Sequence, residues 1–329
     1  MRSLHACAAA LLLSLLSCAA LAQTAAPAKS TAEPAVLETP TGKLHGTLEL
    51  PQGKGPFPVA LVIAGSGPVD RNGNTPVIPG ANNSLKYLAE GLAARGVASL
   101  RFDKRGVAES VMGAKSESDL RFDTYIEDAV AWGRRLRADK RFGTLTVVGH
   151  SEGSLIGMVA AQRLGADGFV SIAGVGRPAQ QTLLEQLKAG LPPDLYARSE
   201  EIVKGLVEGK TTADVPEPLA TLFRPSVQPY LISWFKYDAA AEVAKLDVPV
   251  LLVQGTHDIQ VGVEEAKLLA RAKPAARLLL LEGVNHTLKE APAERAKQGP
   301  AYSDPSLPVV PKLLEELSAF VKSLKRSKS

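Results

Sequence analysis

The chain has 329 residues, 45% of them hydrophobic, and its 38 Lys and Arg nearly balance its 34 Asp and Glu. A chain of this length can bury a large core without disulfide bonds, and it allows one or two domains. Because no long run of one charge precedes residues 322–328, the charge pattern gives no basis for binding nucleic acid or for strong attraction to a membrane surface.

The N-terminal segment has the pattern of a secretory signal peptide. Arg2 precedes an apolar run over residues 8–16 that is too short to span a membrane as a helix, and Ala20-Leu-Ala22 is a small-x-small cleavage site. We therefore predict that residues 1–22 are removed and that the protein is exported, to the periplasm or to the medium. The alternative is a lipoprotein signal in which Cys18 is lipidated, which would anchor the protein to a membrane.

The segment that follows the predicted cleavage site has no obvious regular structure. Residues 23–35 are rich in Ala, Thr, Ser and Pro, which predicts a disordered linker. Both cysteines, Cys7 and Cys18, precede the cleavage site, so the mature chain is expected to contain no disulfide bond. We expect no transmembrane helix in the mature chain, and the sequence does not indicate its oligomeric state.

Beyond residue 42, apolar runs and helical patterns alternate along the chain. The runs predict strands at residues 43–50, 59–64, 97–102, 144–148, 169–173, 248–253 and 276–281. Helical spacing predicts helices at residues 84–95, 124–137, 154–163, 263–273 and 309–324. This rhythm predicts an α/β fold with a mostly parallel sheet and helices on both faces. Sites on such sheets lie beyond the carboxyl ends of the strands.

The alternation stops between residues 174 and 246. Helical patterns occur there without strands, for example at residues 194–208, and fifteen positions contain a cluster of aromatic residues, Phe223, Tyr230, Trp234, Phe235 and Tyr237. We interpret residues 174–246 as a helical cap inserted into a core formed by residues 36–173 and 247–329. The aromatic rings either line an apolar acyl pocket or form the core of the cap itself.

A serine lies between the predicted strand at 144–148 and the predicted helix at 154–163. The sequence Gly149-His-Ser-Glu-Gly153 places one glycine two residues before Ser151 and another two residues after it. Glycine lacks the Cβ that would clash where a strand turns sharply into a helix, so such a turn can hold a serine under strain with its Oγ exposed. The five letters alone also fit an ordinary glycine-rich connection, so the context decides.

A serine hydroxyl becomes a nucleophile when a base takes its proton and a carboxylate orients that base. Loops after two later strands supply both groups, since Asp258 follows residues 248–253 and His286 follows residues 276–281. The chain order of serine, aspartate and histidine is the order that hydrolases with this kind of sheet use. The sequence therefore predicts Ser151, Asp258 and His286 as a catalytic triad.

Each of these assignments has an alternative. Asp258 could be a turn residue, with Asp247 as the acid, but Asp247 precedes its strand and is therefore expected at the opposite end of the sheet. His286 could be an ordinary loop histidine. We expect His150 and His257, which flank the predicted catalytic residues, to pack or hydrogen-bond locally.

The chain resembles an α/β-hydrolase of the serine esterase and serine aminopeptidase-like branch, from about residue 59 to the C-terminus. The motifs that carry the resemblance are Gly65-Ser-Gly-Pro-Val-Asp-Arg-Asn-Gly73, Arg101-Phe-Asp-Lys-Arg-Gly106, Gly149-His-Ser-Glu-Gly153, Gln228-Pro-Tyr-Leu-Ile-Ser-Trp-Phe235, Gly255-Thr-His-Asp258 and Asn285-His286. In similar enzymes the first motif forms the oxyanion loop, the second a structural loop and the third the nucleophile turn. The fourth would belong to the cap, and the last two would hold the acid and the base.

The resemblance also implies an oxyanion hole, in which two N–H donors stabilise the charge of the tetrahedral intermediate. One donor is expected to be the backbone N–H of Glu152, directly after the nucleophile. The other is expected from the loop after residues 59–64, where we favour Ser66 over Gly67. Asp103 and Arg105, in the second motif, are expected to be structural.

We therefore predict an exported serine hydrolase that cleaves carboxylic esters with short or medium acyl chains. No spacing in the sequence indicates a metal site or a phosphate-binding loop, and the predicted chemistry requires neither a metal nor an organic cofactor. An aminopeptidase or a thioesterase would use the same triad, and Glu152 or a cap acid could anchor the free amine of a peptide. A non-catalytic hydrolase-fold protein that binds a ligand or partner is a further alternative, although such proteins typically lack a triad member.

Overall fold

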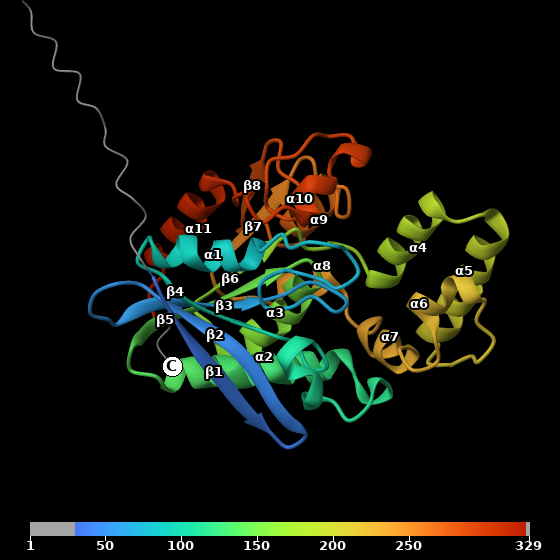
Figure 1. The fold of residues 1–329 in the computed structure, drawn as a ribbon, viewed down its shortest axis with the longest axis horizontal. Coiled ribbons are helices and arrows are strands. Elements are labelled where there is room, and N and C mark those ends of the chain that lie inside the picture. Colours follow the sequence, from blue (N-terminus) through green and yellow to red (C-terminus); the bar gives the residue numbers. More distant parts are fainter. Residues whose placement is uncertain (1–29, 327–329) are drawn as a thin grey trace, which may run out of the picture.

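An eight-stranded sheet forms the centre of the protein in a computed structural model that describes residues 30–326 (Figure 1). The spatial order of the strands is β1-β2-β4-β3-β5-β6-β7-β8. β2 pairs antiparallel with both β1 and β4. The six strands β4, β3, β5, β6, β7 and β8 are parallel to one another. The strands are β1 (Thr31–Thr39), β2 (Gly42–Leu50), β3 (Phe57–Ile63), β4 (Ala98–Phe102), β5 (Phe142–His150), β6 (Gly168–Ile172), β7 (Val250–Gly255) and β8 (Arg277–Leu281). The predicted mostly parallel sheet is confirmed.

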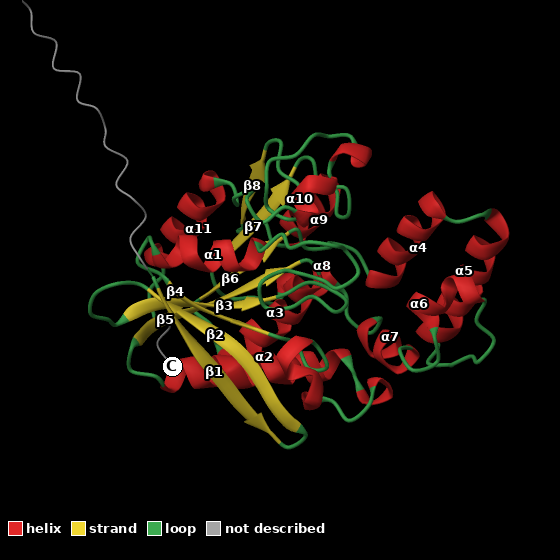
Figure 2. Ribbon diagram, viewed as in Figure 1, coloured by secondary structure: helices red, strands yellow, loops and turns green. Residues whose placement is uncertain are grey.

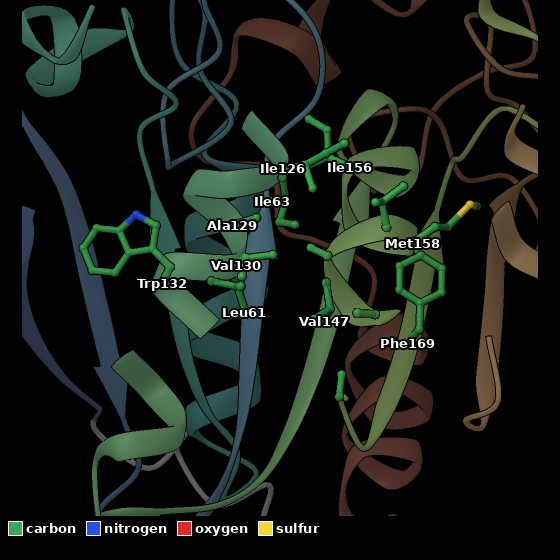
Figure 3. Packing of buried hydrophobic residues seen from close by; sticks show 14 of the residues in the cluster. Leu61, Ile63, Ile126, Ala129, Val130, Trp132, Val147, Ile156, Met158 and Phe169 are labelled. Carbon is green, nitrogen blue, oxygen red and sulfur yellow. The ribbon is translucent and has the colours of Figure 1, made fainter. Parts of the chain in front are cut away.

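Helices cover both faces of this sheet (Figure 2). One face carries α1 (Ser84–Ala93) and α11 (Pro311–Ser323), and the other carries α2 (Phe122–Ala138), α3 (Glu152–Leu164), α8 (Ala239–Ala244) and α9 (Val263–Ala272). In β3, Leu61 and Ile63 pack toward α2 and α3, as Figure 3 shows, while Val62 packs in the cluster on the opposite face. Because both faces are buried, the sequence of β3 reads as a continuous apolar run.

The first strand corrects the predicted linker. Residues 31–35, assigned to the linker at 23–35, form the first half of β1, which pairs with β2 along its whole length from Thr31 with Leu50 to Thr39 with Gly42. The composition suggested disorder, but an edge strand tolerates Pro34 because the N–H that proline lacks can face solvent. The predicted signal peptide at residues 1–22 and the alternative lipid site at Cys18 lie outside the described residues.

A helical cap interrupts the core between β6 and β7. Its helices have their own apolar core and stand at the right of Figure 1; they are α4 (Ala179–Gly190), α5 (Pro193–Val207), α6 (Ala220–Phe223) and α7 (Gln228–Trp234). The prediction placed the end of the cap at residue 246. In the structure α8 packs against α3 through Ala239 and Val243, so it belongs to the core layer and the cap ends after α7.

Short elements complete the described chain. They are the 3-10 helices η1 (Ala108–Gly113), η2 (Glu117–Asp119), η3 (Glu217–Leu219) and η4 (Arg295–Lys297), and the helix α10 (Gly299–Ser303). Within residues 30–326, no helix is both long and apolar enough to cross a membrane.

Candidate active site

The predicted strand, turn and helix around Ser151 are present. β5 ends at His150, α3 begins at Glu152, and Ser151 between them has φ 55° and ψ −123°, a conformation that is strained for any residue with a Cβ. A Cβ on Gly149 would lie 2.1 Å from the carbonyl oxygen of Gly153, and a Cβ on Gly153 would lie 2.4 Å from that of Ile63. Both glycines are therefore required by the close approach of the backbone.

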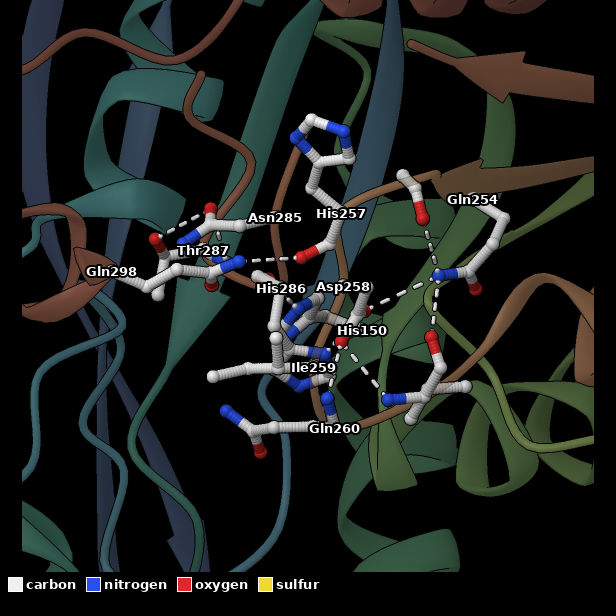
Figure 4. A network of polar contacts seen from close by, with 12 residues as sticks. His150, Gln254, His257, Asp258, Ile259, Gln260, Asn285, His286, Thr287 and Gln298 are labelled. Atoms are coloured by element: carbon white, nitrogen blue, oxygen red, sulfur yellow. Dashed lines mark hydrogen bonds and ion pairs between the residues drawn. The ribbon is translucent and has the colours of Figure 1, made fainter. Parts of the chain in front are cut away.

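The predicted acid and base lie together. Asp258 follows β7 and His286 follows β8, and the Nδ1–H of His286 donates to Oδ2 of Asp258 at 2.7 Å (Figure 4). The side chain of Asp258 is 0% exposed and that of His286 is 7% exposed. With Nδ1 held by the carboxylate, Nε2 is the ring nitrogen left to exchange a proton. The rival acid, Asp247, is exposed and precedes β7, at the other end of the sheet.

Opposing influences act on the carboxyl group of Asp258. Burial alone would raise its pKa, but the charge and hydrogen bond of His286 and the backbone N–H groups of Val261 and Gln260 lower it below the ordinary value. These N–H groups donate to Oδ1 of Asp258 at 2.9 and 2.8 Å. The result is an ionised acid that orients His286 and stabilises its protonated form.

His150 connects this pair to the serine turn. Burial lowers the pKa of His150 to about 3, and the neighbouring His286 acts in the same direction. The ring is therefore neutral, and its Nε2–H donates to the backbone carbonyl of His286 at 2.9 Å. Because His150 directly precedes Ser151, this bond holds the His286 loop beside the serine turn. His150, Asp258 and His286 are called the histidine network below.

Amide side chains that the sequence analysis did not single out support the same loops. Nε2 of Gln254 donates to Oδ2 of Asp258 at 3.3 Å and to the Val261 carbonyl at 2.8 Å, and Nε2 of Gln298 donates to the His257 carbonyl at 2.8 Å (Figure 4). His257 in turn donates through Nδ1 to the Ala291 carbonyl at 2.6 Å. The local roles predicted for His150 and His257 are thus confirmed.

The loop after β3 runs against Ser151. A Cβ on Gly65 would lie 3.1 Å from the Cβ of Ser151, so glycine allows this close approach. Ser66 is exposed, and its N–H has no hydrogen-bond partner within residues 30–326. Glu152 is the first residue of α3, where backbone N–H groups have no partner inside the helix. The loop that carries Ser66 and the first residue of α3 thus both adjoin Ser151, and each has a backbone N–H without a partner inside its own segment.

Polar side chains fix the course of this loop. The backbone N–H and Nη1 of Arg71 donate to the Asp103 carboxylate at 2.7 and 3.1 Å, and Nε of Arg101 donates to Oδ1 of Asn72 at 3.1 Å. Arg105 is also structural, as predicted, because its guanidinium binds Asp128 with contacts of 2.5 and 3.0 Å. The loop after β3 is thus held by the loop after β4.

Comparisons with known proteins identify the family. The sequence profile described as "Serine aminopeptidase, S33" matches residues 81–291, more than half of the chain. The chain belongs to this family. It is 29% identical over 264 residues to Esterase EstD of Thermotoga maritima, which covers 78% of this chain but only 62% of the length of that relative.

Solved structures show the same fold. The α/β-hydrolase GrgF from Penicillium sp. superposes with a TM-score of 0.59 and 14% identity, covering 89% of this chain and 98% of its own. Est1E from Butyrivibrio proteoclasticus, in a structure with bound ferulic acid, gives a TM-score of 0.57 and 18% identity, covering 88% and 96%. These structures confirm the predicted α/β-hydrolase fold, and the family profile confirms the resemblance. The residues that the profile matches, 81–291, include Ser151, Asp258 and His286, and they begin after the loop that contains Ser66.

A second group of polar residues is centred on Glu152, the residue after Ser151. The Lys104 ammonium donates to the Gly65 carbonyl at 2.6 Å and to Oε2 of Glu152 at 2.8 Å, and the Tyr230 hydroxyl donates to Oε1 of Glu152. These residues are called the cap-side network, since Tyr230 belongs to α7. Lys104 and Tyr230 lie in two of the motifs that carry the resemblance, but no individual role was predicted for either, although Lys104 is the second residue after the predicted strand at 97–102.

The described residues offer no grouped metal ligands. Within residues 30–326, no three His, Cys, Asp or Glu side chains lie together so that they could hold a metal ion. The arrangement around Ser151 instead combines a strained serine, a histidine bonded to a carboxylate, and two backbone donors. These are the groups that nucleophilic acyl transfer uses.

Proposed function

We propose that the protein is a serine hydrolase that cleaves carboxylic esters. The Oγ of Ser151 attacks the ester carbonyl while Nε2 of His286 takes its proton, and Asp258 stabilises the resulting imidazolium. The N–H groups of Glu152 and Ser66 receive the oxyanion. The tetrahedral intermediate expels the alcohol, which takes the proton from His286. Water, deprotonated by His286, then attacks the acyl-enzyme and releases the carboxylic acid and the free Ser151 hydroxyl.

One observation carries this proposal, namely that the bonded pair of Asp258 and His286 is attached to the serine turn. The 2.9 Å bond from His150 to the His286 carbonyl and the 2.7 Å bond from His286 to Asp258 join three segments that are far apart in the sequence. A merely structural histidine would not need a strained serine next to it. The printed name of the relative Esterase EstD supports the same chemistry.

The surroundings of Glu152 favour an ester over a peptide with a free amine. An aminopeptidase needs an anionic anchor for the amine, and Glu152 was a candidate for that role. Its side chain is 3% exposed, and both of its oxygens are occupied by Lys104 and Tyr230. The charge of this carboxylate is therefore balanced by the Lys104 ammonium inside the protein, and the carboxylate is not available to bind the amine of a substrate. Parallel assays with an ester, a thioester and an aminoacyl nitroanilide would separate the three activities.

The structure also bears on the acyl group. Phe223 and Phe235 pack in the cap core, while Trp234 stacks on Phe122 of α2 with ring centroids 6.0 Å apart, so the cap aromatics serve mainly packing. An open pocket of about 470 Å³ near the Asp258 loop is lined by Ile78, Pro79 and Ile259 together with Arg295, Gln298, Gly299, Tyr302 and Ser303, and neither Ser151 nor His286 lines it. The preference for a short or medium acyl chain therefore comes from the sequence analysis and not from this pocket. We propose that preference, to be checked with nitrophenyl esters of increasing chain length.

Ser151→Ala tests the reaction. We expect nitrophenyl butyrate hydrolysis to fall by at least about 10⁴-fold with the melting temperature preserved, because the nucleophile is lost. A fluorophosphonate probe, followed by peptide mass mapping, should label Ser151 in the parent protein. Near-parental turnover of the variant would contradict the assignment, and absence of labelling would favour a non-catalytic ligand-binding protein.

We also propose that the protein is exported, on the basis of residues 1–22. After expression in a bacterium, N-terminal sequencing should find Gln23 at the start of the mature protein, in the periplasmic or secreted fraction. A lipid-modified N-terminus at Cys18 in the membrane fraction would support the lipoprotein alternative instead.

A further inference from the structure

Lys104 is a buried cation next to the candidate active site. It lies in the loop after β4, its side chain is 2% exposed, and its ammonium contacts Gly65, Glu152 and the ring of Tyr125, whose centroid is 5.1 Å away. Burying an ammonium and a carboxylate costs several kcal/mol for each ion, and their attraction often does no more than repay that cost. Stability alone therefore does not explain why Lys104 and Glu152 form a buried ion pair.

The two acceptors of Lys104 belong to the two segments that carry the predicted oxyanion donors. Gly65 precedes Ser66, and a trans peptide places the C=O of one residue antiparallel to the N–H of the next in one plane. A bond that holds the Gly65 carbonyl therefore also fixes the direction of the Ser66 N–H. Ser66 and Gly67 are exposed, so without an anchor on the Gly65 carbonyl this peptide could rotate and turn the Ser66 N–H away.

The other contact of Lys104 acts on the second donor segment. Oε2 of Glu152 accepts from Lys104 at 2.8 Å, and Glu152 also supplies the second predicted donor through its backbone N–H. One ammonium thus bridges the loop after β3 and the first residue of α3. The Tyr230 hydroxyl holds the other oxygen of the same carboxylate, so the bridge is also connected to the cap.

We propose that Lys104 is a positioning residue for the oxyanion hole, which sets the Ser66 and Glu152 N–H groups relative to each other through the Gly65 carbonyl and the Glu152 carboxylate. This inference rests on the proposed function. Lys104 does not touch the substrate and takes no part in proton transfer. Its contribution is to hold the donors where the oxyanion forms, which acts on the transition state and leaves ground-state binding nearly unchanged.

The test compares Glu152→Gln with the double variant Lys104→Met and Glu152→Gln. In the single variant the Lys104 ammonium loses its carboxylate partner but can still hold Gly65, whereas the double variant removes both charges and leaves no unpaired ion buried. We expect the double variant to have a kcat about 10- to 100-fold below that of the single variant, with KM within about threefold, because a misdirected donor weakens only transition-state binding. Affinity for a trifluoromethyl ketone, which forms a tetrahedral adduct with the serine, should fall by the same factor.

A neighbouring buried cation provides the matched control. Arg105 lies on the same loop and is paired with Asp128, but its side chain contacts neither donor segment. Arg105→Met with Asp128→Asn is expected to lower the melting temperature and to leave kcat within about twofold of the parent. Equal kcat and equal inhibitor affinity in the Glu152→Gln variant and the Lys104 double variant would overturn the inference. The proposed function would survive that result if fluorophosphonate still labels Ser151 and Ser151→Ala is inactive.

Discussion

In the chain, Ser151 lies between His150 and Glu152, which belong to two polar networks that differ in chemistry. The histidine network consists of His150, which is the last residue of β5, and of Asp258 and His286, which follow β7 and β8. The cap-side network joins Lys104, Glu152 and Tyr230 and includes no histidine. The first holds imidazole rings against a carboxylate and a backbone carbonyl, whereas the second pairs a cation with an anion. Under the proposed function, the histidine network transfers the proton and the cap-side network positions the oxyanion donors.

The two networks also differ in what they connect. The histidine network lies within the core, where the sheet fixes the strand ends to which its loops are attached. The cap-side network reaches from the core to α7, which packs against α2 through the rings of Phe122 and Tyr230, with centroids 6.3 Å apart. The cap is thus bonded to Glu152, the residue after the serine, through Tyr230, and it also contacts the Asp258 loop, because Nε2 of Gln186 in α4 donates to the Gln260 carbonyl at 3.1 Å.

Breaking the histidine network should have the largest effect. In Asp258→Asn the amide cannot stabilise a protonated His286 and favours the wrong ring tautomer, so we expect kcat to fall by about 10⁴-fold. Esterase assays on the folded variant would measure this. Asp247→Asn is the matched control, since Asp247 is exposed at the other end of β7, and it should retain parental activity. If Asp247→Asn were the inactive variant, the assignment of the acid would be wrong.

Breaking the cap-side network should mainly affect stability. Tyr230→Phe removes the hydroxyl that donates to Glu152 but keeps the ring contacts with Phe122 and Trp234. A hydrogen bond to a charged group contributes about 1.5–3 kcal/mol, and we expect a loss of that size in the free energy of unfolding, measured by urea denaturation. Activity should fall less than in Asp258→Asn. Tyr237→Phe, which removes a bond to Asp123 at the protein surface, should cost less.

The two networks were not equally accessible from the sequence. Asp258 and His286 could be predicted because each follows an apolar strand and because the chain order of a hydrolase triad is fixed. Ser151 is marked by glycines whose absence of a Cβ the structure explains. Lys104 and Tyr230 have no such local mark, since they reach Glu152 from 48 and 78 residues away and their pairing depends on how the loops and the cap pack.

The elements of the fold that follow from the local sequence were predicted, whereas those that depend on contacts with distant residues were not. The buried strands and the long helices of the core were predicted to within a few residues because burial on both faces leaves a continuous apolar run. β1 was missed, since the predicted strands begin at residue 43 and the pairing of β1 with β2 depends on a neighbour rather than on its own composition. The end of the cap was misplaced for a related reason, because α8 is helical like the cap but packs against α3.

The smallest predicted effect concerns His150 and the pH dependence of stability. The folded protein keeps His150 neutral down to a pKa of about 3, while in the unfolded chain it titrates near 6.5. Between these values the unfolded state binds one more proton, so stability falls as pH decreases and the contribution is absent above pH 6.5. In His150→Gln the amide can still donate to the His286 carbonyl but does not titrate. Its unfolding free energy should therefore lose less on acidification, by at most about 1.4 kcal/mol per pH unit. Urea denaturation at pH 8 and pH 5 measures the difference, and parallel pH profiles of parent and variant would mean that His150 is charged in the folded protein.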